Sequence, residues 1–457
     1  MENKKVTHTA RLLLRLWNCG LFAAVWFCFY NAYMFDTYRL AGGIFGVICF
    51  LIAYTVLCDV YKAFRIASTS IGEIVFSQFI SFAAADLILY VECCLVYNKY
   101  VDILPGACTV VWQLLGTMGI VLFAKRYFMR HVAPQDTILI YGLSAGREDA
   151  EAFAERLLCK YRHLFRIRRL EPEDTGLEQL RSEVDASATV IMYQVSPDVR
   201  AAIEAWCLDK TKAIYFTPNI TDILELGCEA RQLLDTPLMK YGYRYENLGA
   251  MFVKRFMDIV LSLFFLLLLS PAMLLIAAAI RLEDGGPVFY RQRRYTRKGR
   301  RFDILKFRSM IVDAEKHGFQ PSTEHDPRIT KVSRLIRSTR LDEAPQFINI
   351  LKGDMSLVGP RPERIEHVRM YTEKLPEFSY RLQVKAGLTG YAQVFGKYNT
   401  SAYDKLLLDL MYIEKQSLLL DVKLILLTIR TMFQKESTEG FDSRESRQMQ
   451  KDAQEEE

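Results

Sequence analysis

The chain has 457 residues, 51% of them hydrophobic, and a formal net charge of +6. It is long enough for two or three domains, and its apolar share is high for a wholly soluble protein, so we expect part of it to lie in lipid. Its ten cysteines form no Cys-x-x-Cys pair and no Cys/His ligand spacing, which argues against a zinc site or a disulfide framework.

Four apolar segments in the first 133 residues are each long enough to span a bilayer, at roughly 13–35, 40–60, 74–97 and 104–124. The first is too long and too polar at both flanks for a cleaved signal peptide. Basic residues lie before the first segment, between the second and third, and after the fourth, whereas the other two loops carry only Arg39 and Lys99. The positive-inside rule therefore predicts that both ends of this unit face the cytoplasm.

A soluble α/β domain is expected over residues 134–245. The expected strands are Thr137–Tyr141, Ala188–Val195 and Lys212–Phe216, and the expected helix is Arg147–Tyr161. The turn from Gly142 to Gly146 is similar to a dinucleotide-binding loop, but it lacks the middle glycine that lets a pyrophosphate approach the backbone. We therefore favour a structural or regulatory Rossmann-like domain over one that binds NAD.

The next apolar stretch, Phe256–Ile280, is interrupted by Ser270 and Pro271. Lys254 and Arg255 precede it, and the segment 281–308 that follows carries ten basic residues against three acidic ones. A complete fifth span would place this cationic segment on the outer face, against the positive-inside rule. We expect a helix that enters the membrane, breaks at Pro271 and returns, with Ser270 satisfying part of the freed backbone. A kinked ordinary span is the alternative.

The run from Leu341 to Glu363, LDEAPQFINILKGDMSLVGPRPE, contains two consecutive acids. Asp342 and Glu343 would point about 100° apart on a helix, so they cannot share one proton and we expect two different roles. Pro345 is tolerated only near a helix start, where backbone N–H groups and the helix dipole favour ionised carboxylates. The helix should then continue to Gly353. An acid pair alone is more often a solvated helix start.

Basic residues near these acids favour phosphate chemistry. Pro360 and Pro362 should hold Arg361 in an extended pose from which it can fork onto phosphate oxygens. Three more cations lie near the acids or after the expected strand Phe302–Leu305: Lys306, Arg308 and Arg337. A carboxylate that attacks an anionic phosphate needs such cations or a metal ion to offset the repulsion. Nucleic-acid binding by the arginine-rich segment is a weaker hypothesis, because it does not explain the adjacent membrane helix.

The segment from about 254 to 429 resembles the bacterial sugar transferase family, the monotopic phosphoglycosyl transferases. The resemblance is carried by several ordered motifs: KRFMDIV, GGPVFYRQ, FDILKFRSM, LDEAPQ to GPRPE, VKAGLTGYAQVFG and LDLMYIEKQSLLLDVKLILLTI. These enzymes move a hexose-1-phosphate from a nucleotide sugar to a polyprenyl phosphate. The whole chain resembles the longer members, which begin capsular or exopolysaccharide repeat units.

The resemblance implies that Asp342 attacks a UDP-sugar and expels UMP, leaving a sugar-phosphate on the enzyme that polyprenyl phosphate then takes. Glu343 would hold Mg²⁺, and the phosphates would be bound by Arg361 with Lys306, Arg308 and Arg337. The catalytic domain, 246–434, would sit on a re-entrant helix, 254–281, at the cytoplasmic face of a bacterial inner membrane. A polar acidic tail, 435–457, would follow.

Three positions depart from the family pattern, and one of them is Ala344, which replaces a common leucine. Arg340 stands where a small hydroxyl residue usually caps the acid-bearing helix, and Thr339 or Ser338, one or two residues earlier, could supply the cap instead. Ala386 stands where a proline is common, which should loosen the approach to Gly387. The sugar is a guess, glucose or galactose, from the resemblance to the longer members. A homodimer is expected, and nucleic acid is not an expected partner.

Other interpretations remain open at this point. An enzyme that moves only the sugar would use the two acids as a metal site and release UDP. A membrane scaffold with a nucleotide-sensing domain would need no reaction at all. The amphipathic segments Tyr403–Ile413 and Leu418–Phe433 are suited either to the membrane interface or to packing on the catalytic domain.

Overall fold

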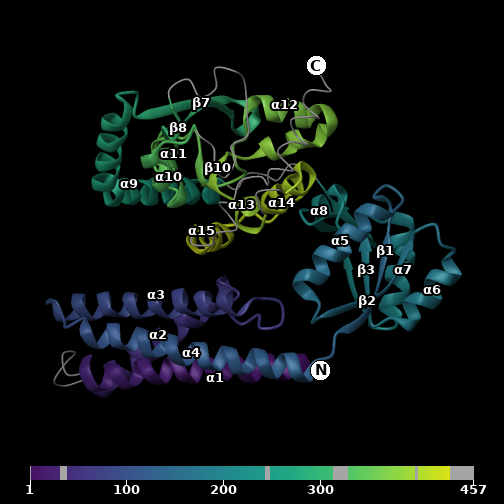
Figure 1. The fold of residues 1–457 in the computed structure, drawn as a ribbon, viewed down its shortest axis with the longest axis horizontal. Coiled ribbons are helices and arrows are strands. Elements are labelled where there is room, and N and C mark those ends of the chain that lie inside the picture. The colour runs from purple at the N-terminus through teal and green to yellow at the C-terminus, as the bar shows by residue number, and fades with distance from the viewer. Residues whose placement is uncertain (1, 31–38, 242–247, 312–327, 397–399, 433–457) are drawn as a thin grey trace. The chain divides into compact units, whose positions relative to one another are not determined.

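The computed structural model describes residues 2–30, 39–241, 248–311, 328–396 and 400–432. They divide into two compact units, Met1–Pro218 and Asn219–Glu457. The chain combines long apolar helices near its N-terminus with α/β structure and a sheet-containing C-terminal domain (Figure 1). In the described residues, five helices are long and apolar enough to cross a membrane, which indicates a membrane protein.

Four long helices match the four apolar segments expected from the sequence. They are α1 (Glu2–Val25, continued by a π-helical turn to Tyr30), α2 (Arg39–Val60), α3 (Ile71–Tyr97) and α4 (Leu104–His131). Their outer faces expose leucine, isoleucine and phenylalanine, whereas polar contacts lie inside. Asn18 donates to the Tyr54 hydroxyl at 2.9 Å, and Tyr54 donates to Gln78. This distribution suits helices that meet lipid outside and each other inside.

A parallel four-stranded sheet with the order β2-β1-β3-β4 follows the helices. Its elements are β1 (Gln135–Tyr141), α5 (Gly146–Tyr161), β2 (Phe165–Pro172), α6 (Leu177–Ala186), β3 (Thr189–Tyr193), α7 (Pro197–Asp209) and β4 (Ala213–Phe216). Alternate residues of β1 face opposite layers. Ile138 and Ile140 pack with α6 and α7, whereas Leu139 and Tyr141 pack with α5. The sequence predicts the other three strands but misses β2, whose alternate positions are charged.

The loop after β1 is occupied by a carboxylate of the chain itself. Glu173 accepts hydrogen bonds from the backbone N–H of Leu143 at 2.9 Å and from that of Ser196 at 2.7 Å. A Cβ at Gly142 would lie 1.9 Å from the Gln194 carbonyl oxygen, so only glycine fits there. Related sheets bind ligands at this edge. Here Glu173 takes two of the N–H groups that a phosphate would otherwise find.

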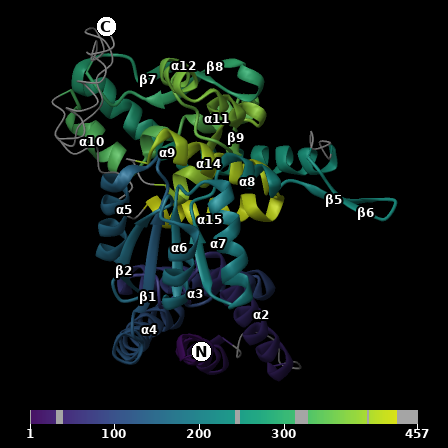
Figure 2. The ribbon, with the colours of Figure 1, turned by 90° about the vertical axis from the view of Figure 1, so that its right-hand side faces the viewer.

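In the described part of the C-terminal unit there are three two-stranded sheets and a set of helices. Its elements are α8 (Ile220–Glu225), β5 (Glu229–Leu233), β6 (Thr236–Lys240), α9 (Leu248–Asp284), β7 (Phe289–Tyr295), β8 (Arg301–Phe307), α10 (Lys331–Ser338), α11 (Gln346–Lys352), β9 (Ser356–Val358), α12 (Ile365–Lys374), β10 (Gly387–Thr389), α13 (Tyr391–Phe395), α14 (Ala402–Glu414) and α15 (Leu418–Met432). The hairpin β5–β6 is fully exposed and extends away from its unit (Figure 2). Ile223 of α8 lies in the unit's core. The expected domain boundaries after residues 133, 245 and 434 stay predictions.

Helix α9 carries the interruption at Pro271 and is drawn as two arms that meet in a bend (Figure 1). Proline leaves the carbonyl four residues earlier without its usual partner, and the Ser270 hydroxyl donates to that carbonyl, on Leu267, at 2.8 Å. Both arms pack against the same unit. Phe265 stacks on Phe347, and beyond the bend Ile280 packs with the core beneath α10. The outward side of α9 exposes a row of leucines.

Helices α14 and α15 follow the two amphipathic segments. Leu406, Leu410 and Leu424 are fully buried in the core of the C-terminal unit, so packing accounts for the apolar side of α14. Helix α15 still exposes Leu419 and Val422. Phe433, at the end of the predicted segment, lies outside the described residues.

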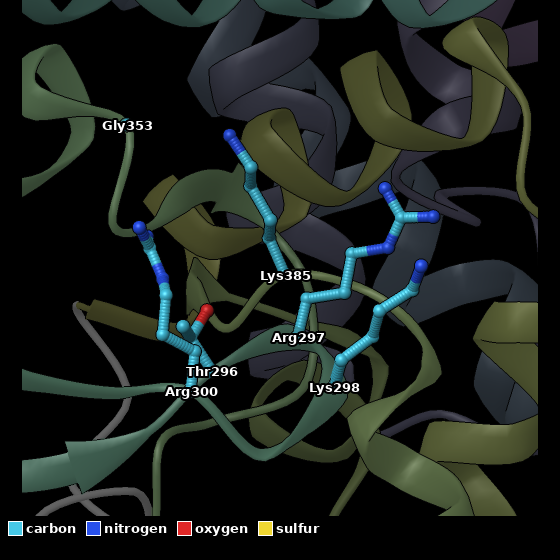
Figure 3. Close-up of a pocket in the computed structure, with 6 residues that line it drawn as sticks. All are labelled: Thr296, Arg297, Lys298, Arg300, Gly353 and Lys385. Carbon is cyan, nitrogen blue, oxygen red and sulfur yellow. The ribbon is translucent and has the colours of Figure 1, made fainter.

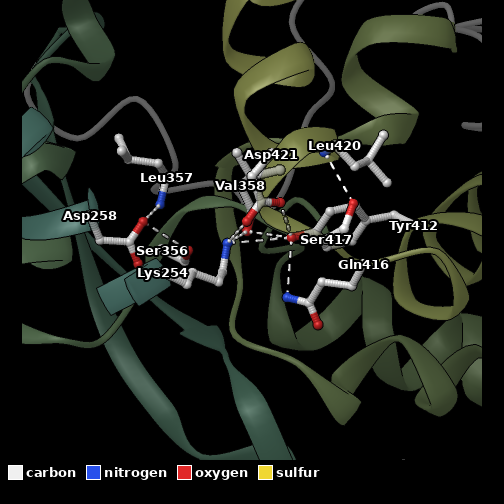
Figure 4. A network of polar contacts seen from close by, with 10 residues as sticks. All are labelled: Lys254, Asp258, Ser356, Leu357, Val358, Tyr412, Gln416, Ser417, Leu420 and Asp421. Carbon is white, nitrogen blue, oxygen red and sulfur yellow. Dashed lines mark hydrogen bonds and ion pairs between the residues drawn. The ribbon is translucent and has the colours of Figure 1, made fainter. Parts of the chain in front are cut away.

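A buried polar network joins the start of α9 to the rest of its unit (Figure 4). Lys254 donates to Asp421 at 2.6 Å, and the Tyr412 hydroxyl donates to the other oxygen of the same carboxylate at 2.8 Å. Asp258, one turn after Lys254, accepts from the Ser356 hydroxyl and from the Leu357 N–H. These bonds hold the first arm of α9 against β9 and α15, and so fix the helix relative to the segment that follows α11.

Candidate active site

The two consecutive acids lie in a short 3₁₀ turn, Leu341–Glu343, directly before α11. Pro345 stands at the N-terminal boundary of α11, with φ −61° and ψ −15°. The helix ends at Gly353, whose φ of +89° suits glycine. The predicted helix end is therefore present, while the acids precede the helix by one turn instead of occupying its first turn.

The expectation that Thr339 or Ser338 caps this turn is wrong. Both hydroxyls donate backwards to the carbonyl of Leu335, at 3.1 and 2.8 Å, because α10 ends there and leaves that carbonyl accessible. The chain then reverses through Arg340, which adopts a left-handed conformation with φ +55° and supplies no side-chain cap. Glu343 donates its backbone N–H to the Arg340 carbonyl at 3.2 Å. Backbone geometry, and not a hydroxyl cap, defines the turn.

Glu343 is held by two cations that converge on one oxygen. Lys306 Nζ, on β8, and Arg361 Nη2 each lie 2.8 Å from Glu343 Oε1. The Glu343 side chain is only 13% exposed. Burial alone would raise its pKa, but Arg361 and Lys306 hold the pKa of Glu343 well below its usual range. This carboxylate is therefore a permanent negative charge at neutral pH.

Asp342 has the opposite electrostatic character. Burial, and next the neighbouring Glu343 carboxylate, raise the pKa of Asp342 to about 6, although Lys306, Arg337 and Arg361 act in the other direction. The group is still mostly ionised at pH 7, but it is the more basic of the two acids. A more basic and less stabilised carboxylate is the better nucleophile, so the two adjacent acids are differentiated by their surroundings.

Of the predicted cations, three act on the two acids. Lys306 and Arg361 bind Glu343 directly, and Arg337 is among the charges that lower the pKa of Asp342. Arg308 follows β8 with its side chain buried, and it is not among the charges that act most strongly on either acid. Arg340, which the sequence presented only as a departure, interacts electrostatically with both acids. Burial lowers the pKa of its guanidinium, which the two acids oppose.

The Pro360-Arg361-Pro362 segment is fixed by three hydrogen bonds as well as by its prolines. Its carbonyls accept in turn from the Gly387 N–H at 2.9 Å, from Arg381 Nη2 at 2.9 Å and from Arg294 Nη1 at 3.1 Å. The backbone of Arg361 and of both neighbouring prolines is therefore fixed by hydrogen bonds. Its pose does not depend on Glu343 alone.

Two residues of this support were missed from the sequence. Arg381, which donates to the Arg361 carbonyl, also forms an ion pair with Asp409 at 2.7 Å, and both side chains are at most 3% exposed. Burial raises the pKa of Asp409 to about 6, which Arg381 opposes. A signal was available, because Asp409 is an isolated acid in the apolar run LLLDLM.

Ala386 does not loosen its surroundings as expected. The side chain is buried, and its backbone N–H donates to the Thr296 hydroxyl at 3.3 Å, a bond that a proline would forbid. The next residue, Gly387, still reaches the Pro360 carbonyl. Ala386 therefore lacks the rigid ring of a proline, but its backbone N–H forms a hydrogen bond that holds the segment in place.

The donor set for a metal ion is small. Within the described residues, no group of three or more His, Cys, Asp or Glu side chains could hold one. Mg²⁺ commonly uses one or two carboxylates and completes its shell with water and substrate phosphates, so Asp342 and Glu343 fit that mode of binding. They would not fit a metal held entirely by protein ligands.

Comparison with known proteins assigns the C-terminal region to one group. A family model described as bacterial sugar transferase matches residues 249–435. A UDP-N-acetylgalactosamine-undecaprenyl-phosphate N-acetylgalactosaminephosphotransferase of Aeromonas hydrophila is 43% identical over 208 residues, which are 43% of this chain and 49% of that protein. A UDP-glucose:undecaprenyl-phosphate glucose-1-phosphate transferase of Escherichia coli K12 is 41% identical over 227 residues, 48% of this chain and 49% of that protein.

A shorter relative is covered almost completely. The uncharacterized sugar transferase EpsL of Bacillus subtilis is 41% identical over 180 residues, which are 39% of this chain and 87% of that protein. The chain spans about half the length of the two longer relatives. The residues matched by the family model include Asp342, Glu343 and Arg361.

Proposed function

Because the chain belongs to the bacterial sugar transferase family, we propose that it transfers a hexose-1-phosphate from a UDP-sugar to undecaprenyl phosphate. The product would begin a capsular or exopolysaccharide repeat unit. The observation that carries the proposal is that the two adjacent acids differ in pKa and in the cations that bind them. Asp342 has a raised pKa, whereas Glu343 is bound by Lys306 and Arg361.

In the first step, an oxygen of the Asp342 carboxylate attacks the phosphorus that carries the sugar. The bond from that phosphorus to the bridging oxygen breaks, and UMP leaves with the electron pair. In the second step, a phosphate oxygen of undecaprenyl phosphate attacks the same phosphorus. The aspartyl bond breaks, the carboxylate is regenerated, and the sugar is now linked through a diphosphate.

The cations make the attack of one anion on another possible. Arg361 presents a fork of donors from a fixed backbone, and Lys306 and Arg337 add positive charge on the side of Asp342. Bound Mg²⁺ would neutralise charge that develops on the phosphate oxygens, and Glu343 would hold it. The raised pKa of Asp342 supports its role as nucleophile, because a fully stabilised carboxylate attacks poorly.

The arrangement of α9 supports a re-entrant helix. Phe265 before the bend and Ile280 after it both pack against the same C-terminal unit, and the exposed face between them is apolar. A straight span would carry the second arm away from that unit. We therefore propose that both ends of α9 lie on the cytoplasmic side of the bacterial inner membrane, with the central Rossmann-like domain on the same side.

The identity of the released nucleotide tests the proposal. Membranes or purified protein should release UMP from one member of a panel of UDP-sugars when undecaprenyl phosphate and Mg²⁺ are present. Asp342→Asn should release none, and only the wild type should carry a sugar-phosphate that mass spectrometry places on Asp342. Release of UDP in place of UMP would indicate transfer of the sugar alone and would overturn the proposal.

A further inference from the structure

A second cationic cavity lies apart from the two acids, beside the turn that joins β7 to β8. It has a volume of about 280 Å³ and is lined by Thr296, Arg297, Lys298, Arg300, Gly353 and Lys385. In Figure 3 the four cationic side chains extend to the same side of the turn, and Lys385 lies between Arg300 and the adjacent Arg297 and Lys298. The proposed transfer uses none of these four cations.

Two of the four cations of this cavity have polar partners among the residues that the structure describes. Arg300 forms an ion pair with Asp354 at 3.2 Å, and Arg297 donates to the neutral Gln383 carbonyl, also at 3.2 Å. Lys298 and Lys385 make no hydrogen bond or ion pair with any residue that the structure describes. A solvated surface cluster tends to disperse its charges, but here two lysines that have no polar partner among the described residues share a hollow with two arginines.

Lys385 is close to a further cation that cannot move away. Arg255 donates to the carbonyls of Ile350 and Leu351 at 2.6 and 2.7 Å, which fixes its guanidinium at the end of α11. Arg255 Nη2 and Lys385 Nζ lie 3.5 and 3.8 Å from the point that a Cβ on Gly353 would occupy. Burial, and next the charge of Arg255, lower the pKa of Lys385, while Asp258 opposes them. A bound anion would relieve this repulsion.

The position of the cavity indicates the source of the anion. Arg255 lies in the first turns of α9, between the exposed rings of Phe252 and Phe256, where the apolar helix begins. If α9 enters the membrane as proposed above, this start of the apolar helix lies at the depth of the lipid headgroups, and the polar wall of the cavity lies beside it. Phosphates at that depth are plentiful, and the cytoplasmic leaflet is negatively charged. A water molecule takes roughly 30 Å³ of liquid volume, so a cavity of this size accommodates a phosphate group.

We propose that Arg297, Lys298, Arg300 and Lys385 form a second phosphate-binding site that holds the headgroup phosphate of an anionic phospholipid. Binding there sets the depth at which the C-terminal unit sits on the bilayer. The lysines contribute point charges and the arginines contribute forked donors, a combination that suits phosphate oxygens. Inorganic phosphate offers the same chemistry, and the experiment below distinguishes binding of free phosphate from binding of the lipid.

The test measures binding to the full-length protein in neutral detergent micelles. Dioctanoyl phosphatidylglycerol should raise the thermal unfolding midpoint, and native mass spectrometry should show a bound lipid. The Lys298→Ala, Lys385→Ala double variant should need at least tenfold more lipid for the same shift. Lys240→Ala with Lys415→Ala removes the same charge from exposed positions of the same unit and should bind like the wild type.

Two single variants, Lys385→Arg and Lys298→Ala, complete the test. Lys385→Arg keeps the charge and should bind the lipid like the wild type. Lys298→Ala alone changes an exposed turn position and should weaken lipid binding, so the test still works if the double variant folds poorly. A shift with phosphatidylglycerol but not with sodium phosphate supports the lipid site. A shift with sodium phosphate alone, or equal lipid binding by wild type and double variant, overturns it. Because binding and not turnover is read, failure here leaves the transferase proposal untouched.

Discussion

Arg361 Nη2 lies 2.8 Å from Glu343 Oε1, and the same oxygen also binds Lys306. One carboxylate thus keeps two cations together that would otherwise repel each other. When an anionic substrate arrives, the cations are already in place and need little reorganisation, which is how electrostatic stabilisation works best. Glu343 is therefore expected to serve the structure of the site as well as any metal.

Replacing Glu343 by glutamine should destabilise the protein. A carboxylate with a depressed folded-state pKa contributes stability above its ordinary pKa of 4.5, and this contribution is lost as the pH falls through the lower folded value. At pH 7 we expect a loss of about 1–3 kcal/mol, because Arg361 is partly exposed and solvent weakens the pair. Thermal unfolding of the wild type and of Glu343→Gln at pH 7 and pH 4 measures this loss of stability. An unchanged midpoint at pH 7 would contradict the expectation.

Replacing the adjacent Asp342 by asparagine should have the opposite effect on stability. Its folded-state pKa is raised from 3.8 to about 6, so its favourable contribution exists at low pH and is lost as the pH rises through about 6. At pH 8 the wild type carries an unfavourable charge that asparagine removes, and we expect a gain of roughly 1–3 kcal/mol. Asp303→Asn, at an exposed position of β8, is the matched control. Equal midpoints for Asp342→Asn and wild type at pH 8 would argue against the raised pKa.

The same raised pKa sets the pH dependence expected for the reaction. Because the nucleophile must be ionised, kcat/KM should rise with pH through an acid limb near 6, the value in the free enzyme. In Glu343→Gln the neighbouring negative charge is gone while the cations remain, so any residual activity should show an acid limb at lower pH. UMP release measured from pH 5 to pH 8 gives both profiles. A limb that stays in place in the variant would show that Glu343 does not raise the pKa of Asp342.

Local sequence signals predicted where α11 ends and how the backbone beside Pro271 is satisfied, because these features depend on a few neighbouring residues. Gly353 ends α11, and Ser270 bonds the carbonyl that Pro271 leaves free. The acid turn was predicted less well, because the left-handed conformation of Arg340 is uncommon for a residue with a side chain. Its cause lies in the packing of α10 against the turn, which no local pattern reveals.

The site residues that were not identified from the sequence are positioned by contacts between distant segments. The sequence identified Arg361 by its two prolines, but not Arg381, which is 20 residues away and reaches its carbonyl. Nor did it pair Arg381 with Asp409 across the core. Such partners are set by how α12, α14 and the intervening turn pack together, and a lone acid in an apolar helix indicates only that some partner exists.

The Arg381–Asp409 pair should act through the position of Arg361. Lysine at 381 keeps the charge but cannot reach both Asp409 and the Arg361 carbonyl with a planar fork. We expect Arg381→Lys to lower kcat about 10–100-fold with a smaller change in KM, as a misplaced catalytic geometry would. Arg369→Lys, at an exposed position of α12, should leave both constants unchanged. A loss confined to thermal stability, with normal kcat in the folded fraction, would limit the pair to a structural role.

The topology of α9 can be tested by accessibility. In a background without the ten native cysteines, all of which are unpaired, single cysteines at Met251 and Leu282 should be labelled only when a membrane-impermeant reagent reaches the cytoplasmic side. A cysteine at Leu275, just beyond the bend, should resist labelling from either side because lipid covers it. Labelling of Leu282→Cys from the outer side would show that α9 crosses the membrane.

Pro271→Ala is the matched variant for this experiment, because it restores the missing backbone bond and removes the clash that bends the helix. A straight α9 would be long enough to span, because its 36 apolar-rich residues include an 18-residue stretch of high mean hydropathy. The cationic residues that follow oppose such a crossing by the positive-inside rule. We therefore expect Pro271→Ala to lower UMP release and to expose Leu282→Cys to outer labelling in only a minor fraction of molecules. Complete outer labelling would mean that the proline, and not the charge, determines the topology.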